Sequence, residues 1–535
     1  MHAALTGNAR LAISVLFGAV MLVSLIACVN VANLILARGA ARQQEIALRI
    51  AVGASRNRIL RQLITENLLL SALSGSLGVV LASATVRLLI VFGPSDIPRL
   101  SEAAIDPVVL MWTFALCVLV GIVFGMTPAL HHTPSRSSEA PTGRSQRVSA
   151  LLAIAELALA IVLLTGAGLL IRSFLALQAI NPGFQPEGVL TMNLYVPGSA
   201  ARGITFEHAV LDRVSALPGV LSAGAVQGLF SLGDIRGGLT LRLEGRPPEP
   251  EEQWIPINWT TIDGDYFQTM GIPLLKGRFF TAQDGPNAPL VVMIDEWLAR
   301  HYWPGENAIG KRLKGTDPRG RHDDWLTVVG LVKDIRNHGR DREPTPHVYQ
   351  PQSQSLRFVQ DLVVRTSNSA YVAASLRGLI RSIEKDAVLS RVTTIEQQLS
   401  DQVSRRRFQT WLLALFASVA LLLATIGMYG LLHYSVTRRT REIGIRMALG
   451  AGGRVVIVMV LRQGLILAAA GLTLGIAGSL LFTRVLSSLL FGVTPTDPVT
   501  FGLVSSTLVF VALVACYVPA RRAAKVNPTI ALRYE

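Results

Sequence analysis

Cysteine is scarce in this sequence. The three cysteines, Cys28, Cys117 and Cys516, all lie within long apolar runs. The polar segment 173–405, which separates two groups of such runs, contains none. Disulfides therefore cannot stabilise this segment, and its fold must depend on a hydrophobic core of its own.

Catalytic and metal-binding motifs are also missing. Neither Gly-x-Ser-x-Gly nor His-Glu-x-x-His occurs, and the nine histidines are not grouped with cysteines or carboxylates at ligand spacing. Neighbouring carboxylates such as Asp263/Asp265 and Asp323/Asp324 are typical of a solvated surface. We therefore expect no catalytic residue, metal site or cofactor on this chain, and the sequence argues against an enzyme.

One stretch comes close to a nucleotide-binding loop but lacks its last residue. Residues 305–312 read Gly-Glu-Asn-Ala-Ile-Gly-Lys-Arg, with Arg312 where a Walker A motif has the Ser or Thr that holds Mg²⁺. No helical pattern follows the stretch. We expect a tight turn after Trp303-Pro304-Gly305 rather than a nucleotide site.

Apolar sequence, in contrast, is abundant. Hydrophobic residues make up 50% of the 535, and the mean hydropathy is +0.44, which is too apolar for an ordinary soluble protein. A helix needs about 20 apolar residues to cross a bilayer. The sequence predicts a polytopic α-helical membrane protein with about seven spans, at 11–37, 63–93, 108–130, 150–172, 409–434, 455–485 and 500–520.

The net charge of +15 is concentrated in short loops, whereas the polar segment 173–405 is nearly balanced. Cytoplasmic loops of membrane proteins are rich in Lys and Arg. We therefore expect the N-terminus and the polar segment outside the cytoplasm, the C-terminus inside, and no nucleic-acid partner. The basic clusters lie at 38–61, 136–147, 438–454 and 521–525, and the loops 94–107 and 486–499 are nearly without basic residues.

A repeated stretch lies between two spans in each half of the chain. Residues 441–451 read Arg-Glu-Ile-Gly-Ile-Arg-Met-Ala-Leu-Gly-Ala, and residues 44–54 read Gln-Glu-Ile-Ala-Leu-Arg-Ile-Ala-Val-Gly-Ala. The spacing places the Glu and Arg of each copy on one face of a short helix, with apolar residues on an adjoining face. The equivalent residues, 397 positions apart, are Glu45 and Glu442, Arg49 and Arg446, and Gly53 and Gly450.

A connector helix that merely lies on the membrane surface is the alternative for either copy alone. Two matched copies at equivalent membrane positions favour a surface that binds a fixed protein partner. The six residues Glu45, Arg49, Gly53, Glu442, Arg446 and Gly450 are therefore the candidate docking residues.

The repeat extends over spans one to three and five to seven. The fourth span and the polar segment precede only the second unit, so the symmetry predicts another span and another exported domain ahead of residue 1. A mis-assigned start and a naturally short homologue are the alternatives. The resulting organisation is a tail at 1–10, a three-span unit at 11–130, a cytoplasmic linker at 131–149, a single span at 150–172, the exported domain at 173–405, a second three-span unit at 406–520 and a cytoplasmic tail at 521–535.

A few polar residues interrupt the spans. Asn30 and Asn33 are expected to form hydrogen bonds between helices. Arg87, Arg484, Glu66 and Glu156 lie near span ends, where long side chains reach the interface. A proton relay through the two glutamates is the alternative.

Short β-branched stretches alternate with amphipathic stretches in 173–405, which predicts an α+β domain of two subdomains. The predicted strands are 189–194, 239–243, 255–261, 290–294, 326–332 and 361–365, and the predicted helices are 206–216, 296–302, 370–383 and 394–403.

Several motifs together resemble the MacB/FtsX-like permeases of ABC systems, in the long bacterial form with two fused halves. The resemblance rests on Glu-Ile-x-x-Arg-x-Ala-x-Gly-Ala in both repeats and on Pro-Ala-Arg-Arg-Ala-Ala-Lys-Val-Asn-Pro at 519–528. In the polar segment it rests on 266–278, 302–312 and 328–334. It covers nearly the whole chain, except that the first span and first exported domain of the two-half proteins are absent and that Pro-Ala-Leu-His-His at 128–132 lacks the basic pattern of 519–528.

The resemblance implies a permease subunit of the bacterial inner membrane with a MacB-like periplasmic core domain. ATP and Mg²⁺ would be bound by a separate ABC ATPase docked on the two repeated helices, and mechanotransmission would drive efflux or envelope export. An FtsX-like non-transporting regulator of an envelope enzyme or signalling partner is the alternative. A periplasmic adaptor and a homodimer are further partners that the resemblance leaves open, and the sequence indicates no substrate.

Overall fold

The computed structural model divides the chain into two compact units, Met1–Ala176 with Ser404–Glu535 and Leu177–Val403. We call the first the helical unit and the second the α+β unit. The structure describes residues 2–41, 49, 52, 55–92, 104–115, 118–119, 142–229, 240–247, 255, 257–316, 324–336, 344–355, 359–438, 440–449 and 452–524.

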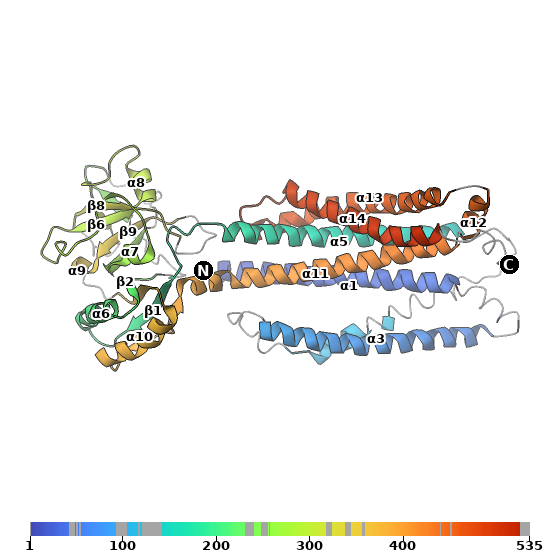
Figure 1. The fold of residues 1–535 in the computed structure, drawn as a ribbon, viewed down its shortest axis with the longest axis horizontal. Coiled ribbons are helices and arrows are strands. Elements are labelled where there is room, and N and C mark those ends of the chain that lie inside the picture. Colours follow the sequence, from blue (N-terminus) through green and yellow to red (C-terminus); the bar gives the residue numbers. More distant parts are fainter. Residues whose placement is uncertain are drawn as a thin grey trace. The chain divides into compact units, whose positions relative to one another are not determined.

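The helical unit consists mainly of long apolar helices (Figure 1). Six helices of the described residues are long and apolar enough to cross a membrane, and the seventh predicted span, 108–130, lies largely outside those residues. The helices are α1 (His2–Ala41), α3 (Arg56–Phe92), α5 (Thr142–Gln178), α11 (Ile395–Arg438), the short α12 (Thr440–Ala448), α13 (Gly453–Leu486) and α14 (Pro498–Ala523).

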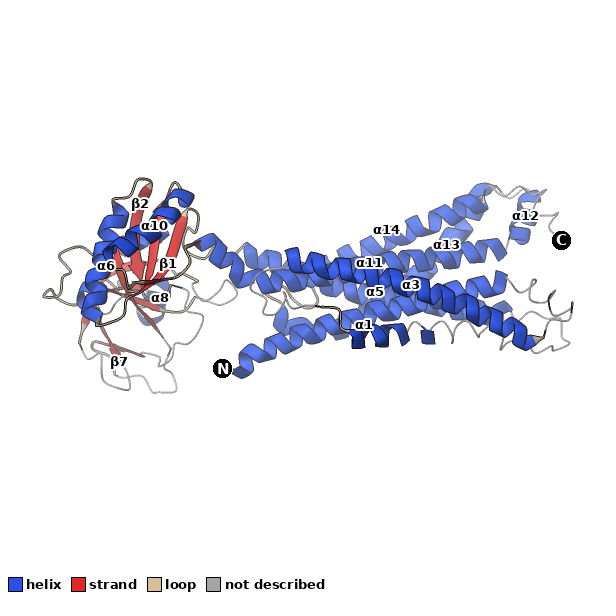
Figure 2. Ribbon diagram, turned by 90° about the horizontal axis from the view of Figure 1, so that it is seen from below, coloured by secondary structure: helices blue, strands red, loops and turns tan. Residues whose placement is uncertain are grey.

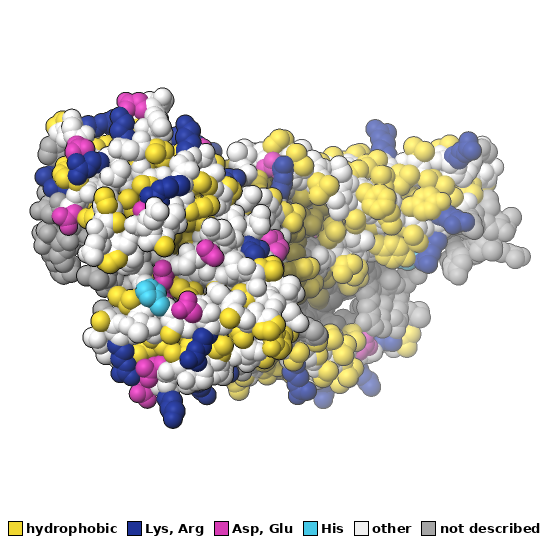
Figure 3. All heavy atoms as spheres, turned by 60° about the vertical axis from the view of Figure 1, so that its left-hand side comes forward, with side chains coloured by type: hydrophobic (Ala, Val, Ile, Leu, Met, Phe, Trp, Pro, Cys, Tyr) yellow, Lys and Arg dark blue, Asp and Glu magenta, His cyan; other side chains and the backbone are white. Residues whose placement is uncertain are grey.

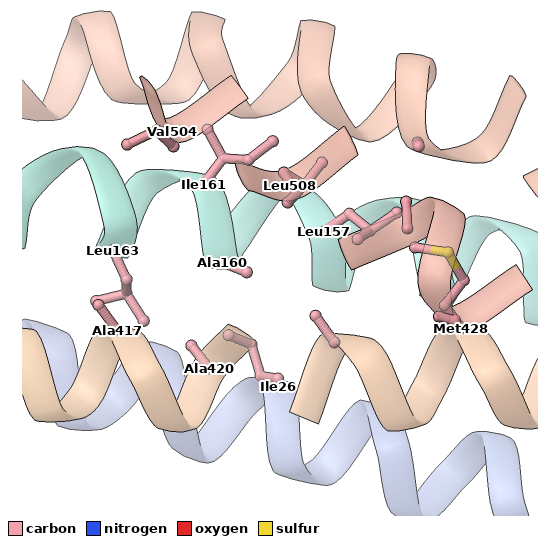
Figure 4. Close-up of a cluster of buried hydrophobic side chains, with 14 of the residues drawn as sticks. Ile26, Leu157, Ala160, Ile161, Leu163, Ala417, Ala420, Met428, Val504 and Leu508 are labelled. Atoms are coloured by element: carbon pink, nitrogen blue, oxygen red, sulfur yellow. The ribbon is translucent and has the colours of Figure 1, made fainter. Parts of the chain in front are cut away.

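Small residues allow the helices to pack closely around α5. Ala417, Ala420 and Ala424 on α11 are buried together with Leu157 and Ile161 of α5 (Figure 4). On α13, a Cβ atom at Gly471 would lie 2.6 Å from the Cβ of Leu157, and one at Gly475 would lie 2.7 Å from the Cβ of Ile161. Close backbone approach of this kind is the usual way in which helices associate in lipid, where no hydrophobic effect drives them together.

The outward faces of these helices remain apolar. Trp411, Leu481 and Phe510 are 71%, 69% and 67% exposed. Figure 3 shows hydrophobic side chains over much of the visible helical surface, whereas acidic and basic side chains are scattered over the α+β unit. An apolar exterior is what contact with lipid tails requires.

The α+β unit contains one mixed sheet of 12 strands rather than separate sheets (Figure 2). The strand order is β11-β1-β10-β2-β4-β9-β6-β8-β7-β3, with β12 beside β1 and β5 beside β8. The strands are β1 (Val189–Tyr195), β2 (Val220–Val226), β3 (Thr240–Leu243), β4 (Asn258–Gly264), β5 (Leu274–Gly277), β6 (Val291–Asp295), β7 (Arg312–Thr316), β8 (Leu326–Val332), β9 (His347–Pro351), β10 (Asp361–Thr366), β11 (Val388–Leu389) and β12 (Thr393–Thr394).

Helices pack on this sheet to enclose three apolar cores. The first core lies between strands β1, β10 and β2 and the two helices that contain Val210 and Leu376. The second surrounds Tyr266 and Tyr349, and the third surrounds Val292. The helices are α6 (Ala200–Ser215), α7 (Tyr266–Met270), α8 (Glu296–Tyr302), α9 (Gln352–Ser355) and α10 (Ser369–Ile383).

The helix predicted at 394–403 and the span predicted at 409–434 form one continuous helix, α11. Neither Gly nor Pro occurs between Ile395 and Ile426, so nothing in the sequence ends the helix there. The first turns of α11 place Ile395 and Leu399 in the second core of the α+β unit.

Candidate functional site

The second repeated stretch forms a separate short helix, α12, whose predicted ion pair is confirmed. Glu442 Oε1 accepts a hydrogen bond from Arg446 Nη2 at 2.6 Å. Both side chains are about half exposed, at 49% and 54%. An exposed i,i+4 pair stabilises a helix by well under about 1 kcal/mol, so stability alone gives little reason to repeat it.

The inner face of α12 attaches it to the neighbouring helices. Ile443 is 1% exposed and packs against Val456 of α13 and Ala523 of α14, with Met447 beside them. The outer face carries Ile445 at 42% and Leu449 at 82% exposure. The inner face of α12 therefore contacts both α13 and α14.

The first repeated stretch is described only in part: Arg49 and Val52 are described, whereas Glu45 and Gly53, like Gly450 of the second copy, lie outside the described residues. Arg49 is exposed and its Nη1 donates to Gln62 Oε1 at 2.9 Å. Val52 is 82% exposed, the same fraction as Leu449.

The arginine of each copy contacts an equivalent position of the next helix. Arg446 Nη1 lies 3.5 Å from Met459 Sδ, and Met459 follows Gln62 by the same 397 residues that separate the two arginines. Leu449 follows Val52 by this offset as well. Each copy therefore presents an arginine held against the next helix and an exposed apolar side chain three residues later.

Sequence reasoning did not single out Gln62, Met459, Val52 or Leu449. The offset of 397 residues could have identified all four, because it predicts equivalent surroundings for equivalent residues. The helical periodicity alone could not, since it predicts a face and not which of its residues stay uncovered.

The stretch that resembles a nucleotide-binding loop forms a turn, as predicted. Glu306 N donates to Trp303 O at 3.1 Å, and Gly305 has φ +76°, the geometry of a type II turn with Pro and Gly at its centre. Lys311 pairs with Glu306 at 2.8 Å, and strand β7 follows where a phosphate-binding loop has a helix. Among the described residues, no group of three or more His, Cys, Asp or Glu side chains could hold a metal ion.

The prediction that Glu156 reaches the membrane interface is wrong. Glu156 on α5 is 1% exposed, and its Oε1 accepts a hydrogen bond from Asn30 Nδ2 of α1. The partner across the helix contact holds the carboxyl inside the bundle, and periodicity within one span cannot reveal such a partner. Asn30 is thus an interhelical hydrogen-bonding residue, as predicted, whereas neither polar atom of Asn33 has a hydrogen-bond partner among the described residues.

Among the described residues of the α+β unit, Glu207 and Asp295 are buried carboxyl groups with a raised pKa. Glu207 on α6 is 1% exposed, and its Oε2 accepts hydrogen bonds from Gln352 Nε2 and from Val359 N at 3.1 Å. Burial raises the pKa of Glu207 to about 9. Burial likewise raises the pKa of Asp295, which caps α8 through Leu298 N at 2.9 Å, to about 8.

Arg365 attaches the segment that follows α5 to the sheet. From β10, its guanidinium donates to the carbonyl oxygens of Gln185, Glu187 and Thr269 at 2.9 Å each. Two of these bonds go to the backbone at 185–187 and the third goes to α7, so one rigid side chain holds the segment more firmly than a single contact could.

Family models match the two parts of the chain separately. The FtsX-like permease C-terminal model matches residues 17–133 and 414–528, and the MacB-like periplasmic core domain model matches residues 150–381. The chain belongs to the MacB/FtsX-like family of ABC transporter permeases. The two FtsX-like matches begin 397 residues apart, the offset of the repeat.

Relatives in this family include proteins with the name "Macrolide export ATP-binding/permease protein MacB". The one from Marinobacter nauticus is 27% identical over 322 residues, which cover 57% of this chain and 47% of the relative. The one from Bdellovibrio bacteriovorus is 26% identical over 405 residues, which cover 68% of this chain and 60% of the relative. This chain thus spans about half the length of the curated relatives it matches.

A solved structure of the periplasmic region of MacB from Actinobacillus actinomycetemcomitans is 18% identical to this chain. The alignment covers 42% of this chain and 95% of that structure, with a TM-score of 0.28.

Proposed function

We propose that this chain is the transmembrane subunit of an ABC export system and that a separate ATPase, which binds ATP and Mg²⁺, docks on α12 and on the equivalent segment 44–54. The observation that carries the proposal is the matched pair of exposed surfaces. Arg49 with Val52, and Arg446 with Leu449, stand at the same positions of the repeat. Arginine is enriched in protein interfaces, and the fully buried core of an interface is apolar.

The contacts of α12 support transmission of force from such a partner. Ile443 links α12 to α13 and α14, and the continuous helix α11 joins the helical unit to the core that contains Ile395. Arg365 holds the other connection, at Gln185 and Glu187. Movement imposed on α12 by ATP hydrolysis would in this way change the posture of the α+β unit.

The orientation we propose places the α+β unit in the periplasm and α12 and the C-terminus on the cytoplasmic side of a bacterial inner membrane. Exposed basic residues support this assignment, since Arg454, Arg521 and Arg522 lie at the ends of α13 and α14 nearest α12.

The relatives' name supports efflux, and macrolides are the compound class to test first. Loss of macrolide resistance on deletion of the gene would favour transport. Unchanged resistance, together with a cell-wall phenotype, would favour the regulator. A periplasmic adaptor would be the natural next component of an efflux path.

The decisive experiment is affinity purification of the full chain from native membranes through a C-terminal tag, followed by identification of co-purifying ATPases. In a variant with Glu442→Arg and Arg446→Glu the ion pair can re-form but its polarity is reversed. We expect at least about tenfold lower recovery of the ATPase, because like charges then face each other in the complex. The substitution Leu449→Asp should also lower the recovery of the ATPase.

The matched control reverses another exposed ion pair, through Glu306→Lys with Lys311→Glu in the α+β unit, which are 53% and 46% exposed. This variant should recover the ATPase as the unmodified chain does. Equal recovery by both reversed variants, or an eluate without ATPase from well-folded protein, would contradict the docking assignment.

A further inference from the structure

Asn30 joins three helices inside the helical unit. Its Nδ2 donates to Glu156 Oε1 of α5 and to the carbonyl oxygen of Leu423 on α11, the latter at 2.8 Å. Asn30 and Glu156 are 4% and 1% exposed. Because polar groups are costly to bury in an apolar bundle unless they are hydrogen-bonded, each of these two side chains favours a position beside the other.

Gly427 on α11 provides the space for this contact. A Cβ atom at Gly427 would overlap the carboxyl of Glu156 and the Oδ1 of Asn30. Any residue other than glycine would displace one of these groups or separate α11 from α1. The hydrogen bond between Asn30 and Glu156 therefore depends on the space that Gly427 leaves.

Gly427 is also the counterpart of Asn30 in the repeat, because it follows Asn30 by 397 residues. Leu423, which accepts the second hydrogen bond, is the counterpart of Ile26, and Figure 4 shows Ile26 of α1 close to α11. The two repeats thus meet at equivalent positions, as identical subunits do around a two-fold axis.

The contact needs one residue of each kind: the amide of Asn30 on one helix and the space left by Gly427 on the other. Two α11 helices would place glycine opposite glycine and leave the Glu156 carboxyl without its amide donor. Two α1 helices would place asparagine opposite asparagine without the space that Gly427 leaves. Mutual exclusion of this kind is how interfaces discriminate between alternative partners.

We propose that Asn30, Glu156 and Gly427 form an intrachain lock, in which α1 is the partner surface of α5 and α11. A first repeat then pairs with a second repeat rather than with another first repeat, and the structure forms this pair within one chain. This inference is independent of the ATPase and of the substrate.

Disulfide cross-linking of the full chain in native membranes tests the pairing. A Cβ at Gly430 would lie 3.8 Å from Leu34 Cδ2, so Leu34→Cys with Gly430→Cys places two thiols at facing positions of α1 and α11. The background carries Cys28→Ser, Cys117→Ser and Cys516→Ala. Mild oxidation should give an internally linked monomer, detected as a mobility shift that reductant reverses.

Co-expression separates the two modes of pairing. One tagged chain carries only Leu34→Cys, and a differently tagged chain carries only Gly430→Cys. We expect no linked dimer from this mixture. A linked dimer as its main product would overturn the proposal, as would the absence of any disulfide in the double variant.

Variants of the lock test the residues. Asn30→Leu should reduce the yield of the internal disulfide about tenfold. Asn33→Leu is the matched control, since Asn33 is 7% exposed on the same helix and makes no hydrogen bond to the described residues. An equal loss of the internal disulfide in Asn30→Leu and Asn33→Leu would contradict the proposed role of Asn30.

If Asn30→Leu does not accumulate in the membrane, an exchange variant still provides the test. Asn30→Gly with Gly427→Asn moves the amide to α11 and the space to α1, next to the same carboxyl. It should restore both accumulation and the internal disulfide relative to either single change. No restoration would mean that the polar contact does not specify the pairing.

Discussion

At the scale of single residues, Glu207 is the clearest source of pH dependence. Its pKa rises from an ordinary 4.5 to about 9, first because burial disfavours the carboxylate and in smaller part because Asp263 is near. Between these two pH values the folded chain holds a proton that the unfolded chain releases. The contribution of Glu207 to the stability of the α+β unit is therefore fully present below about pH 4.5 and is lost as the pH rises towards 9.

This predicts an effect of Glu207→Gln on stability. The amide can still accept from Gln352 and Val359 but does not titrate. We expect urea unfolding of the unmodified chain to have a lower midpoint at pH 8 than at pH 6, and the variant to show a smaller difference and a higher midpoint at pH 8. Each pKa unit corresponds to about 1.4 kcal/mol.

Tryptophan fluorescence of the full chain in detergent provides the measurement, because five of the seven tryptophans lie between Trp254 and Trp325. The urea midpoint of the variant should still fall somewhat as the pH rises, since the pKa of Asp295 is also raised, to about 8. Glu306→Gln, at an exposed position, is the control. A variant as pH-dependent as the unmodified chain would exclude Glu207 as the source.

At the scale of elements, α13 shows how glycines fix a helix contact. Gly475 lies so close to α5 that any Cβ meets Ile161, whereas a Cβ at Gly502 on α14 would have no heavy atom within 4 Å. Close packing is therefore required on one helix face and not on the other, although both glycines lie in apolar spans.

The matched substitutions Gly475→Val and Gly502→Val test this difference. The first should destabilise the helical unit by about 1–3 kcal/mol through overpacking, and the second should have little effect. Thermal unfolding in detergent, followed by loss of monodisperse protein on size-exclusion chromatography, compares them. Similar losses for both would mean that the intrinsic cost of valine in a helix, and not the contact with Ile161, dominates.

Elements were predictable from sequence where local chemistry determines them. Strand β8 and helix α8 have the predicted bounds, because a nearly continuous apolar run marks the strand and an aspartate cap marks the helix. Helix α6 begins six residues before the predicted start, because Ser199, whose side chain accepts from Arg202 N, caps it there. Strand β4 lies three residues later than predicted, because its pairing with β2 through Ile262 decides its extent.

Strand β2 was not predicted at all. It contains Ala and Gly rather than a β-branched run, and Gly224 is required because a Cβ there would meet the backbone of Tyr266. The candidate docking helix was predictable because its residues repeat, whereas the contact of Asn30 with Glu156 was not, because it joins helices 126 residues apart.

At the scale of the whole molecule, the proposed orientation across the membrane makes a direct prediction. Leu221 in the α+β unit and Leu449, directly after α12, are 68% and 82% exposed, so a cysteine at either position should react readily with a thiol reagent that can reach it. In a background without native cysteines, Leu221→Cys should react with a membrane-impermeant maleimide added to spheroplasts, and Leu449→Cys only after lysis.

The two variants serve as controls for each other, because both side chains are exposed and neither belongs to a buried core. Labelling of Leu449→Cys in sealed spheroplasts would place α12 outside and overturn both the orientation and the docking of a cytoplasmic ATPase. Reaction of both positions only after lysis would place the α+β unit on the cytoplasmic side.

The difference between Asn30 and Gly427 also has a genetic consequence. The two repeats are similar sequences within one gene, and similar sequences can exchange stretches by gene conversion. If the lock holds, conversion across this codon in either direction would leave two glycines or two asparagines where one of each is required. Selection against such products would keep the two halves distinct at this position even where recombination makes their flanks alike.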